Sequence, residues 1–420
     1  MSAMQRQVRA AGSTRHDEMC ARDSYDVRDD TRANTRCKGP HAVVTQFTLL
    51  LSLVRAVALT VIASCAVAKP WDGPYVGHDA DNQWSALWIE ADGEQLVARS
   101  RKVNLGEEIE IPAAGARPSF KVQLRDSAKP APDATQGATP MFIVADTHGE
   151  FEIATELLIR HHIIDEKLSW SFGKGQLVFL GDVFDRGPHH TELLWLIYKL
   201  EAQAARAGGA VHLVLGNHET MVLLGDDRYL HPKYQRSARA LNAPSYAALW
   251  GANSILGRWL RTKASVMKIG DYLCVHGGLG PELVTRKLTL DIINSTVRDA
   301  LQSRHALPQP LAENLTFIMG PDGPLWYRGY FGKTGSQSTQ ATSTDVNAVL
   351  KHFNAKRILV GHTRVPTIAP LYDGKVIAVQ VYPHLDEHTG APVMESLLIR
   401  DGTFFRALAD GELQKLETKN

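Results

Sequence analysis

Five short polar clusters follow apolar runs of this sequence directly, and their side chains are of the kinds that bind metal ions. The clusters are ADTHGE, GDVFDRG, GNHE, VHGG and VGHT, and their candidate ligands are Asp146, His148, Asp182, Asn217, His276 and His362. Carboxylate and amide oxygens and neutral imidazole nitrogens suit Mn, Fe, Zn or Co, and no cysteine among them selects a softer metal. The residue types therefore predict a metal centre.

The chemistry of these ligands is that of a centre with two ions. Asp182 is the candidate bridge, because one carboxylate can bind two ions about 3.5–4 Å apart. Asp146 and His148 are expected to complete the first site. The ligands left for the second site are Asn217, His276 and His362. Two such ions make hydroxide available from a shared water at neutral pH, and hydroxide is the nucleophile that phosphate ester hydrolysis requires.

The elements around the clusters explain how residues so far apart in the sequence can meet. Apolar runs at residues 141–145, 176–180 and 211–215 indicate buried strands, and a helical period follows the first two. Alternating strands and helices are typical of βαβ units in an α/β fold. Ligands of such folds gather beyond the carboxyl ends of the strands, so we expect the five clusters to converge there. The run at 266–278 predicts a hairpin that turns at Gly270-Asp271.

Taken in order, the motifs DxHG, GDxxDRG, GNHE, HGG and a late GH resemble those of the phosphoprotein phosphatase branch of the metallophosphoesterases. The resemblance covers roughly residues 140–410, and DTHGE, GPLWYRGYF and VGHT are most similar to the bacterial Shewanella-like phosphatases. Ala145 replaces the glycine that usually precedes the first aspartate in the eukaryotic Ser/Thr enzymes, while the aspartate and histidine are kept. The resemblance implies the metallophosphoesterase fold, a central β-sandwich flanked by helices.

The same resemblance implies roles for further side chains. His218 would be the general acid, oriented by Asp185, because an alkoxide leaves poorly without a proton. Arg186 and Arg328 would bind phosphate oxygens through their planar, charged guanidinium groups. Asn217 would contact both metal and phosphate.

Four further residues receive predictions without a catalytic or metal-binding role. Glu219 is given a structural role only, and His189 and His190 are expected to be exposed at the start of a helix. Trp326, beside Arg328, is expected to be a packing residue, although an aromatic ring there would suit an aryl phosphate such as phosphotyrosine.

The predicted function is dimetal hydrolysis of phosphomonoesters, by direct attack of a metal-bridging hydroxide. Phosphorylated proteins or small phosphoesters are the expected substrates, and the resemblance slightly favours phosphotyrosine. A dinucleoside polyphosphate hydrolase, which uses the same motif set, is one alternative, and a non-catalytic metal-bound binding protein is another. The presence of Asp182, Arg186 and His218 argues against lost catalysis. The formal net charge of +1 gives no field that favours a nucleic-acid partner.

The start of the chain predicts export. Residues 41–68 are apolar and end in Ala66-Val67-Ala68, which is typical of a secretory signal cleaved before Lys69. A membrane anchor and a lipid on Cys65 are the alternatives, and both would tether the protein to a membrane. The expected location is therefore periplasmic, or membrane-anchored and facing the periplasm.

Composition divides the rest of the chain as well. Residues 1–40 are polar without apolar periodicity, so they are expected to be disordered or untranslated. Short alternating runs predict a small β-rich module at 69–125, and a stretch rich in proline and alanine predicts a linker at 126–140. Residues 141–410 are expected to form the calcineurin-like metallophosphoesterase domain.

Overall fold

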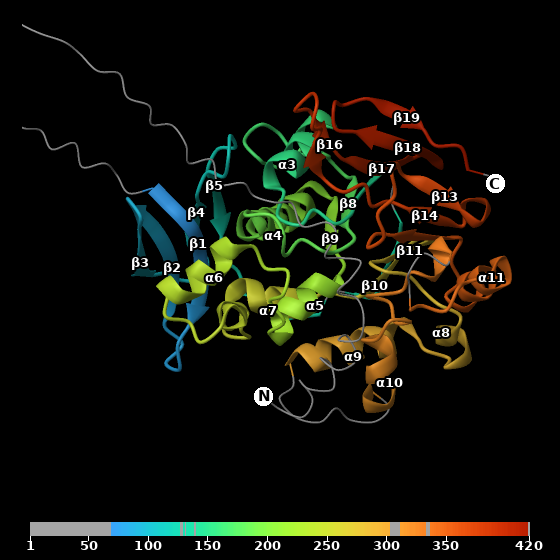
Figure 1. The fold of residues 1–420 in the computed structure, drawn as a ribbon, viewed down its shortest axis with the longest axis horizontal. Coiled ribbons are helices and arrows are strands. Elements are labelled where there is room, and N and C mark those ends of the chain that lie inside the picture. Colours follow the sequence, from blue (N-terminus) through green and yellow to red (C-terminus); the bar gives the residue numbers. More distant parts are fainter. Residues whose placement is uncertain are drawn as a thin grey trace, which may run out of the picture. The chain divides into compact units, whose positions relative to one another are not determined.

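Two six-stranded sheets form the centre of the computed structural model (Figure 1). The model describes residues 69–126, 129–130, 132–137, 140–302, 311–332 and 337–418. The first sheet contains β7 (Met141–Val144), β8 (Gln176–Phe179), β9 (Ala210–Leu213), β17 (Glu395–Arg400), β18 (Thr403–Leu408) and β19 (Leu413–Lys415). The second contains β6 (Ala134–Thr135), β10 (Val266–Ile269), β11 (Tyr272–Val275), β12 (Arg357–Val360), β13 (Ala369–Leu371) and β14 (Val376–Ala378). Their strand orders are β19-β18-β17-β7-β8-β9 and β13-β14-β12-β11-β10-β6.

Each sheet has a parallel centre, and the two sheets share one apolar core. Strands β7, β8 and β9 run parallel in the first sheet, as do β11, β12 and β14 in the second. Ile143 and Val178 of the first sheet belong to the same fully buried cluster as Cys274 and Ile377 of the second. Strands covered on both faces need apolar residues at successive positions, which explains the continuous runs in the sequence. The predicted β-sandwich is confirmed.

Helices flank the sandwich and connect its parallel strands. They are α3 (Phe151–Arg160), α4 (His190–Ala207), α5 (Asn217–Leu224), α6 (Pro232–Ala240), α7 (Ile255–Arg261), α8 (Glu282–Thr285), α9 (Leu290–Gln302), α10 (Leu311–Ile318) and α11 (Ser343–His352). Short 3₁₀ turns are η2 (Tyr246–Trp250), η3 (Gly329–Phe331) and η4 (Tyr372–Gly374). Helix α3 links β7 to β8 and α4 links β8 to β9, which confirms the predicted βαβ units. Among the described helices, none has the length and apolar character needed to cross a bilayer.

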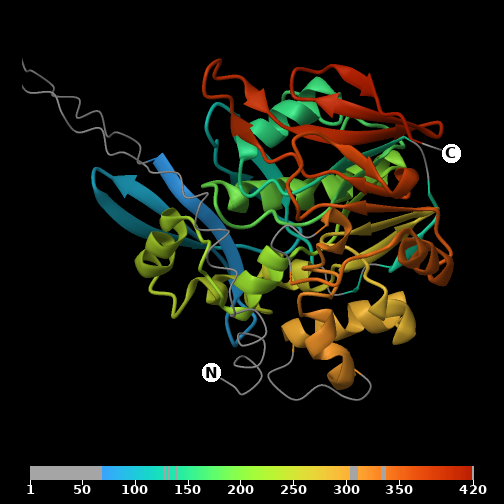
Figure 2. The same cartoon turned by 45° about the vertical axis from the view of Figure 1, so that its right-hand side comes forward.

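The N-terminal extension consists of strands, as predicted, and it packs on α4. Its antiparallel sheet contains β1 (Lys69–His78), β2 (Trp84–Asp92) and β3 (Gln95–Lys102), and a hairpin follows with β4 (Glu108–Ile111) and β5 (Phe120–Gln123). Trp195 of α4 donates its indole N–H to the carbonyl oxygen of Pro74 at 2.9 Å. Figure 2 shows the extension beside α4, α6 and α7, and contacts join all three helices to it. The extension is thus attached to helices that flank the sandwich.

Two connecting segments belong to the second sheet. Strand β6 lies inside residues 126–140, the predicted linker, and pairs in parallel with β10, where Ala134 is opposite Lys268. The predicted hairpin is confirmed, because β10 and β11 are antiparallel and Ile269 is opposite Tyr272. The predicted disordered or untranslated segment and the predicted signal or anchor, residues 1–40 and 41–68, lie outside the described residues. Two short strands, β15 (His384–Leu385) and β16 (Pro392–Val393), form a separate pair.

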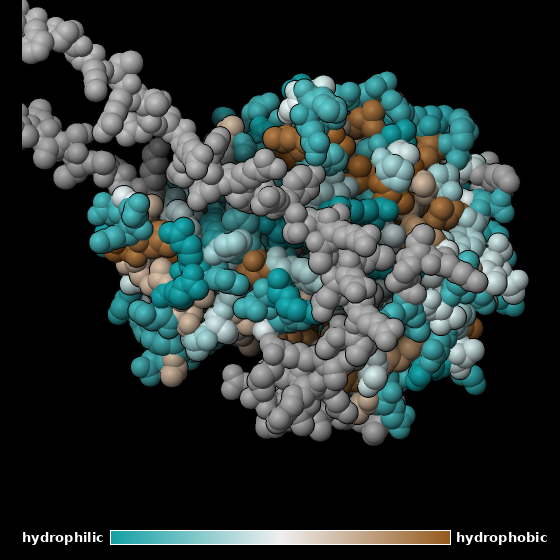
Figure 3. Space-filling model, viewed as in Figure 1, coloured by the Kyte–Doolittle hydropathy of each residue, from teal (hydrophilic) through white to brown (hydrophobic). Residues whose placement is uncertain are grey.

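The described surface offers little continuous apolar area. On the face shown in Figure 3, hydrophilic side chains predominate and apolar ones form small separate groups. Within the described ranges the large exposed hydrophobic residues are Leu105, Leu385 and Leu413. Isolated leucines of this kind are ordinary at a protein surface and do not mark a docking site.

Candidate metal centre

The five predicted clusters meet at one edge of the sandwich, where parallel strands of both sheets end. Strands β7, β8, β9, β11 and β12 are followed, in that order, by Asp146, Asp182, Asn217, His276 and His362. The imidazole of His276 donates through Nδ1 to the carbonyl oxygen of Leu180 at 2.7 Å, which joins the second sheet to the first. The backbone N–H of His362 donates to the carboxylate of Asp146 at 3.0 Å and makes a second such connection.

One group of possible ligands surrounds the carboxylate of Asp182. Its Oδ2 lies 3.7 Å from Nε2 of His148 and 3.7 Å from Nε2 of His218. His148 donates through Nδ1 to the carbonyl oxygen of Phe184 at 2.9 Å, so its other nitrogen is directed at the carboxylate. The three side chains are buried and close enough together to hold one ion.

A second group shares Asp182 with the first. Nε2 of His276 lies 3.2 Å from Oδ2 of Asp182, 2.9 Å from Oδ1 of Asn217 and 3.1 Å from Nδ1 of His362. Adjacent ligands of an ion that is about 2.0–2.2 Å from each of them lie roughly 3 Å apart, so these separations fit a shared ion. The chemistry of the donors and the position of Asp182 in both groups therefore fit a centre with two ions.

Asp146, the other ligand expected in the first site, adjoins these groups through His276 and His362. Its carboxylate accepts the N–H of His362 and lies 3.8 Å from Nδ1 of His276. Burial raises the pKa of Asp146 to about 7, against the opposing effect of His276. The described side chains thus leave this acid short of positive charge, which a bound cation would supply.

The backbone at these strand ends is unusual. Six of the ten predicted site residues have φ between 44° and 70°, in the left-handed region: Asp146, His148, Asp182, Asp185, Arg186 and His362. Such a conformation costs about 1–3 kcal/mol for a residue other than glycine and persists only where neighbouring contacts hold it. Strain gathered in this way is typical of functional sites.

Glu219 is a supporting residue for which the sequence analysis gave no specific role. Its fully buried carboxylate accepts four backbone N–H groups, those of Gly216 at 2.7 Å, Asp182 at 2.8 Å, Val183 at 2.7 Å and Phe184 at 3.2 Å. Three of these donors belong to the loop that carries Asp182. The sequence indicated this role only by placing an acid beside His218, directly after an apolar run that was expected to be buried.

Two glycines let the loops after β8 and β9 approach closely. A Cβ atom on Gly181, which has φ of +91°, would lie 2.4 Å from the nitrogen of Gly216. A Cβ on Gly216 would lie 2.2 Å from Oδ1 of Asp182. Larger residues at either position would therefore displace the candidate bridging carboxylate.

The candidate general acid is held by a carboxylate. Nδ1 of His218 donates to Oδ2 of Asp185 at 2.6 Å, which leaves Nε2 facing Asp182. Burial opposes protonation of His218, but Asp182 and Asp185 outweigh it and raise the pKa of the imidazole. The two carboxylates thus favour the protonated imidazole, whose Nε2 faces the side where the ligand groups meet.

The two predicted phosphate-binding arginines adjoin different candidate ligands, Arg186 near His148 and Arg328 at His362. Nε of Arg186 is buried and has no hydrogen-bond partner among the described residues. Burial lowers the pKa of His148, and the charge of Arg186 adds to this effect. Nη1 of Arg328 donates to the carbonyl oxygen of His362 at 3.1 Å and to Oγ1 of Thr363 at 3.2 Å. Two guanidinium groups around a centre of this kind favour an anion.

Aromatic rings surround the same centre. The ring centroid of Tyr229 lies 5.2 Å from that of His218, and Tyr382 lies 5.9 Å from His148. Trp326 lies 5.7 Å from the ring of His362, so it is placed beside the centre as well as beside Arg328. The sequence analysis assigned neither tyrosine to the site, because both lie outside the five polar clusters.

His190 corrects the sequence analysis. We predicted an exposed residue at the start of a helix, but the side chain is fully buried, whereas that of His189 remains partly exposed. The ring of His190 stacks on that of Tyr234, with centroids 3.6 Å apart. Tyr234 belongs to α6, and the sequence of α4 alone does not predict that α6 packs there. Tertiary packing of α6 on the start of α4 therefore decides the burial of His190.

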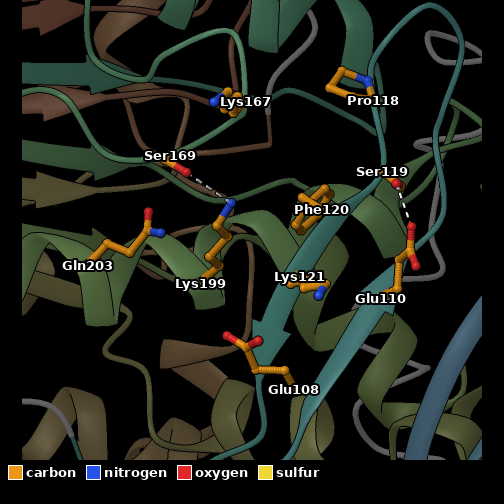
Figure 4. Close-up of a pocket in the computed structure, with 10 residues that line it drawn as sticks. All are labelled: Glu108, Glu110, Pro118, Ser119, Phe120, Lys121, Lys167, Ser169, Lys199 and Gln203. Atoms are coloured by element: carbon orange, nitrogen blue, oxygen red, sulfur yellow. Dashed lines mark hydrogen bonds between the residues drawn. The ribbon is translucent and has the colours of Figure 1, made fainter.

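A surface hollow of about 430 Å³ lies away from the centre (Figure 4). The residues that line it are Glu108, Glu110, Pro118, Ser119, Phe120, Lys121, Lys167, Ser169, Lys199 and Gln203. Lys199 donates to the carbonyl oxygen of Leu168 at 2.9 Å, and Ser119 donates to Glu110 at 2.6 Å, so both are used within the fold. None of the predicted site residues contributes to this hollow.

The sandwich with its two ligand groups defines a metal-dependent phosphoesterase. Residues 139–366 match the model of the calcineurin-like phosphoesterase family, and this chain belongs to that family. The family assignment confirms the resemblance inferred from the motifs and makes the protein a hydrolase of phosphoesters.

Known structures and sequences give finer similarities. The crystal structure of a cold-active protein-tyrosine phosphatase from a psychrophilic Shewanella species matches with a TM-score of 0.70 and 36% identity, over 82% of this chain and 99% of that one. Shewanella-like protein phosphatase 1 of Plasmodium berghei is 28% identical over 53% of this chain and 61% of its own length. Shewanella-like protein phosphatase 2 of Arabidopsis thaliana is 26% identical over 52% of this chain and 65% of its own length. The match thus spans less than two thirds of either of these two relatives.

Proposed function

We propose that this protein is a protein phosphatase that hydrolyses phosphomonoesters, with phosphotyrosine as its favoured substrate. The observation that carries the proposal is the position of Asp182, whose carboxylate belongs to two groups of possible ligands while His218 faces it from beside Asp185. The rings of Tyr229 and Tyr382 would pack against an aryl group. The similar Shewanella structure is that of a protein-tyrosine phosphatase, which supports the same substrate class.

The centre suits two ions of Mn, Fe, Zn or Co, because its donors are imidazoles, carboxylates and one amide oxygen. Asp146, His148 and Asp182 would hold the first ion, and Asn217, His276 and His362 would hold the second with Asp182. When bound, two such ions would lower the pKa of a coordinated water and offset negative charge on the phosphate.

The remaining steps belong to side chains of this chain. Arg186 and Arg328 would bind the non-bridging phosphate oxygens and orient the ester. His218 would donate the proton on Nε2 to the departing oxygen, while its hydrogen bond to Asp185 keeps the ring in place. Positioned general acids of this kind contribute about 10²–10⁴-fold to a rate.

A matched set of substrates tests the function. The purified protein would be loaded with each of the four metals in turn and given a phosphotyrosine peptide, a phosphoserine peptide, an aryl phosphate and diadenosine tetraphosphate. We expect metal-stimulated turnover with preference for the phosphotyrosine peptide. Preference for the dinucleotide would favour the nucleotide hydrolase instead, and no turnover with any metal would favour a binding protein.

The general acid is tested by His218→Asn. We expect the metal content to stay nearly unchanged while kcat falls about 10²–10⁴-fold for esters with poor leaving groups, and much less for activated aryl esters. Metal content by mass spectrometry serves as the control. Unchanged activity would show that His218 is not the acid.

We also propose that the protein is exported. Support comes from the apolar run at residues 41–68 and its small-residue ending Ala66-Val67-Ala68, which are typical of a secretory signal. The experiment is cell fractionation followed by N-terminal analysis of the purified chain. An N-terminus at Lys69 is expected, and an intact or lipidated N-terminus would point to a tether.

A further inference from the structure

The buried His190 lies within a set of aromatic rings next to the proposed general acid. Its ring stacks on Tyr234 at an interplanar angle of 15° and lies 4.8 Å from the ring of Phe184. Tyr246 and Trp250 of η2 complete this set at 5.8 Å and 6.2 Å. The rings come from three separate segments of the chain, so the orientation of the imidazole is fixed from several sides.

Two hydrogen bonds fix which nitrogen of His190 carries its proton. The backbone N–H of Asp185 donates to Nδ1 at 3.3 Å, so Nδ1 must be an unprotonated acceptor. Nε2 therefore carries the hydrogen and donates to the hydroxyl oxygen of Tyr246 at 2.5 Å. Burial lowers the pKa of His190 well below its usual value, so the neutral ring with this arrangement persists.

Asp185 needs such support. Its φ of 70° lies in the left-handed region, and the Oδ1 atom of its carboxylate is buried without a hydrogen-bond partner among the described residues. The hydrogen bond that Oδ2 accepts from His218 therefore holds the side chain of Asp185 at one oxygen only. The orientation of the carboxylate then depends on the backbone of Asp185. A rotation of the peptide at Asp185 would move the carboxylate away from the imidazole.

We propose that His190 is a positioning residue for the general acid, holding the backbone of Asp185 so that its carboxylate stays bonded to His218. The proposal rests on the proposed function, because it assigns His190 to the same proton transfer. It also gives the N-terminal extension a part in the site, because Tyr75 of β1 packs against Tyr246 and Trp250 with ring centroids 6.4 Å and 5.8 Å apart.

The first test uses kinetics of the full chain with its metals. His190→Leu keeps an apolar side chain but loses the acceptor, whereas His190→Asn keeps an acceptor oxygen near the position of Nδ1. Phenyl phosphate has the poorer leaving group and p-nitrophenyl phosphate the better one. For His190→Leu we expect kcat to fall about 10–100-fold with phenyl phosphate and less than about 3-fold with p-nitrophenyl phosphate. His190→Asn should recover most of the loss.

The second test does not depend on turnover. A short hydrogen bond between imidazole and carboxylate gives a downfield proton resonance, which would be identified by its absence in Asp185→Asn. We expect this resonance in the wild type and in His190→Asn, and its loss in His190→Leu. His161→Leu is the matched control, since it removes a partly buried imidazole that donates to the carbonyl oxygen of Leu408, away from the centre, and should alter neither the resonance nor the substrate ratio.

The outcomes separate the two proposals. Equal losses with both substrates, or a resonance that persists in His190→Leu, would overturn the positioning role and leave a purely structural one. If the wild type hydrolysed neither phosphate with any of the four metals, the proposed function would fail, and the resonance alone would then decide whether His190 positions Asp185.

Discussion

Replacing Glu219 by glutamine should damage the centre without touching a candidate ligand. The carboxylate accepts two backbone N–H groups through each oxygen and is fully buried. Glutamine keeps one acceptor oxygen, but an NH₂ group replaces the other. That group can only donate, so it cannot accept the remaining two backbone N–H groups. Two buried backbone donors would therefore lose their acceptor and face another donor.

The size of the effect follows from these bonds. A hydrogen bond to a charged group contributes about 1.5–3 kcal/mol, so the loss of two predicts that the free energy of unfolding falls by about 3–6 kcal/mol. That is a large share of the roughly 5–15 kcal/mol that stabilises a typical domain.

The assay is urea unfolding followed by the fluorescence of the chain's eight tryptophans, with metal and with chelator. Glu282→Gln is the matched control, because Glu282 is a partly exposed carboxylate paired with Arg286 one helical turn away. Its loss should cost less than about 1 kcal/mol. A deficit below 1 kcal/mol for Glu219→Gln, or one equal to that of the control, would refute the claim that the carboxylate holds the loop of Asp182.

Two further substitutions test other parts of the argument. Asp182→Asn should lower both metal content and activity, because Asp182 belongs to both ligand groups, and two ions retained per chain by mass spectrometry would contradict the bridge. Lys233→Met should leave the buried carboxylates of Asp72 and Glu192 without their cation and destabilise the protein by about 3–5 kcal/mol at pH 7. The loss in free energy of unfolding should be smaller in acid, because protonated carboxyl groups need no cation. Urea unfolding of both proteins at pH 7 and pH 5 measures this difference.

Most of the fold could be predicted from the sequence, because strand propensity, hydrophobicity and helical periodicity indicated the same elements. Runs such as that at residues 141–145 combine strand propensity with full burial, and the helix pattern that follows each run requires a parallel connection. Parallel strands in one sheet end on the same side, so the polar residues after them had to lie near one another. The hairpin at Gly270-Asp271 followed from a turn signal between two apolar runs.

Features that depend on contacts between distant segments left no such signal. The rings of Tyr229 and Tyr382 lie at the centre because two irregular segments fold back on it, and neither segment has a period or motif. His190 looked like a helix-start residue because only the packing of α6 and η2 buries it. The place of Asp146 beside His276 depends in the same way on how the two sheets meet.

The supports of the centre have a common origin in the fold. The loop GDVFDRG combines left-handed residues with acids, so it needs hydrogen-bond partners at both ends. Glu219 supplies acceptors near Asp182, and His190 supplies one at Asp185. Glu219 is the third residue of α5 and His190 the first of α4. In a βαβ unit the first turn of the following helix is the regular element nearest the strand end, so rigid support for a strained loop is best placed there. The residues that begin α4 and α5 should therefore affect the centre as strongly as some residues that would touch the metal.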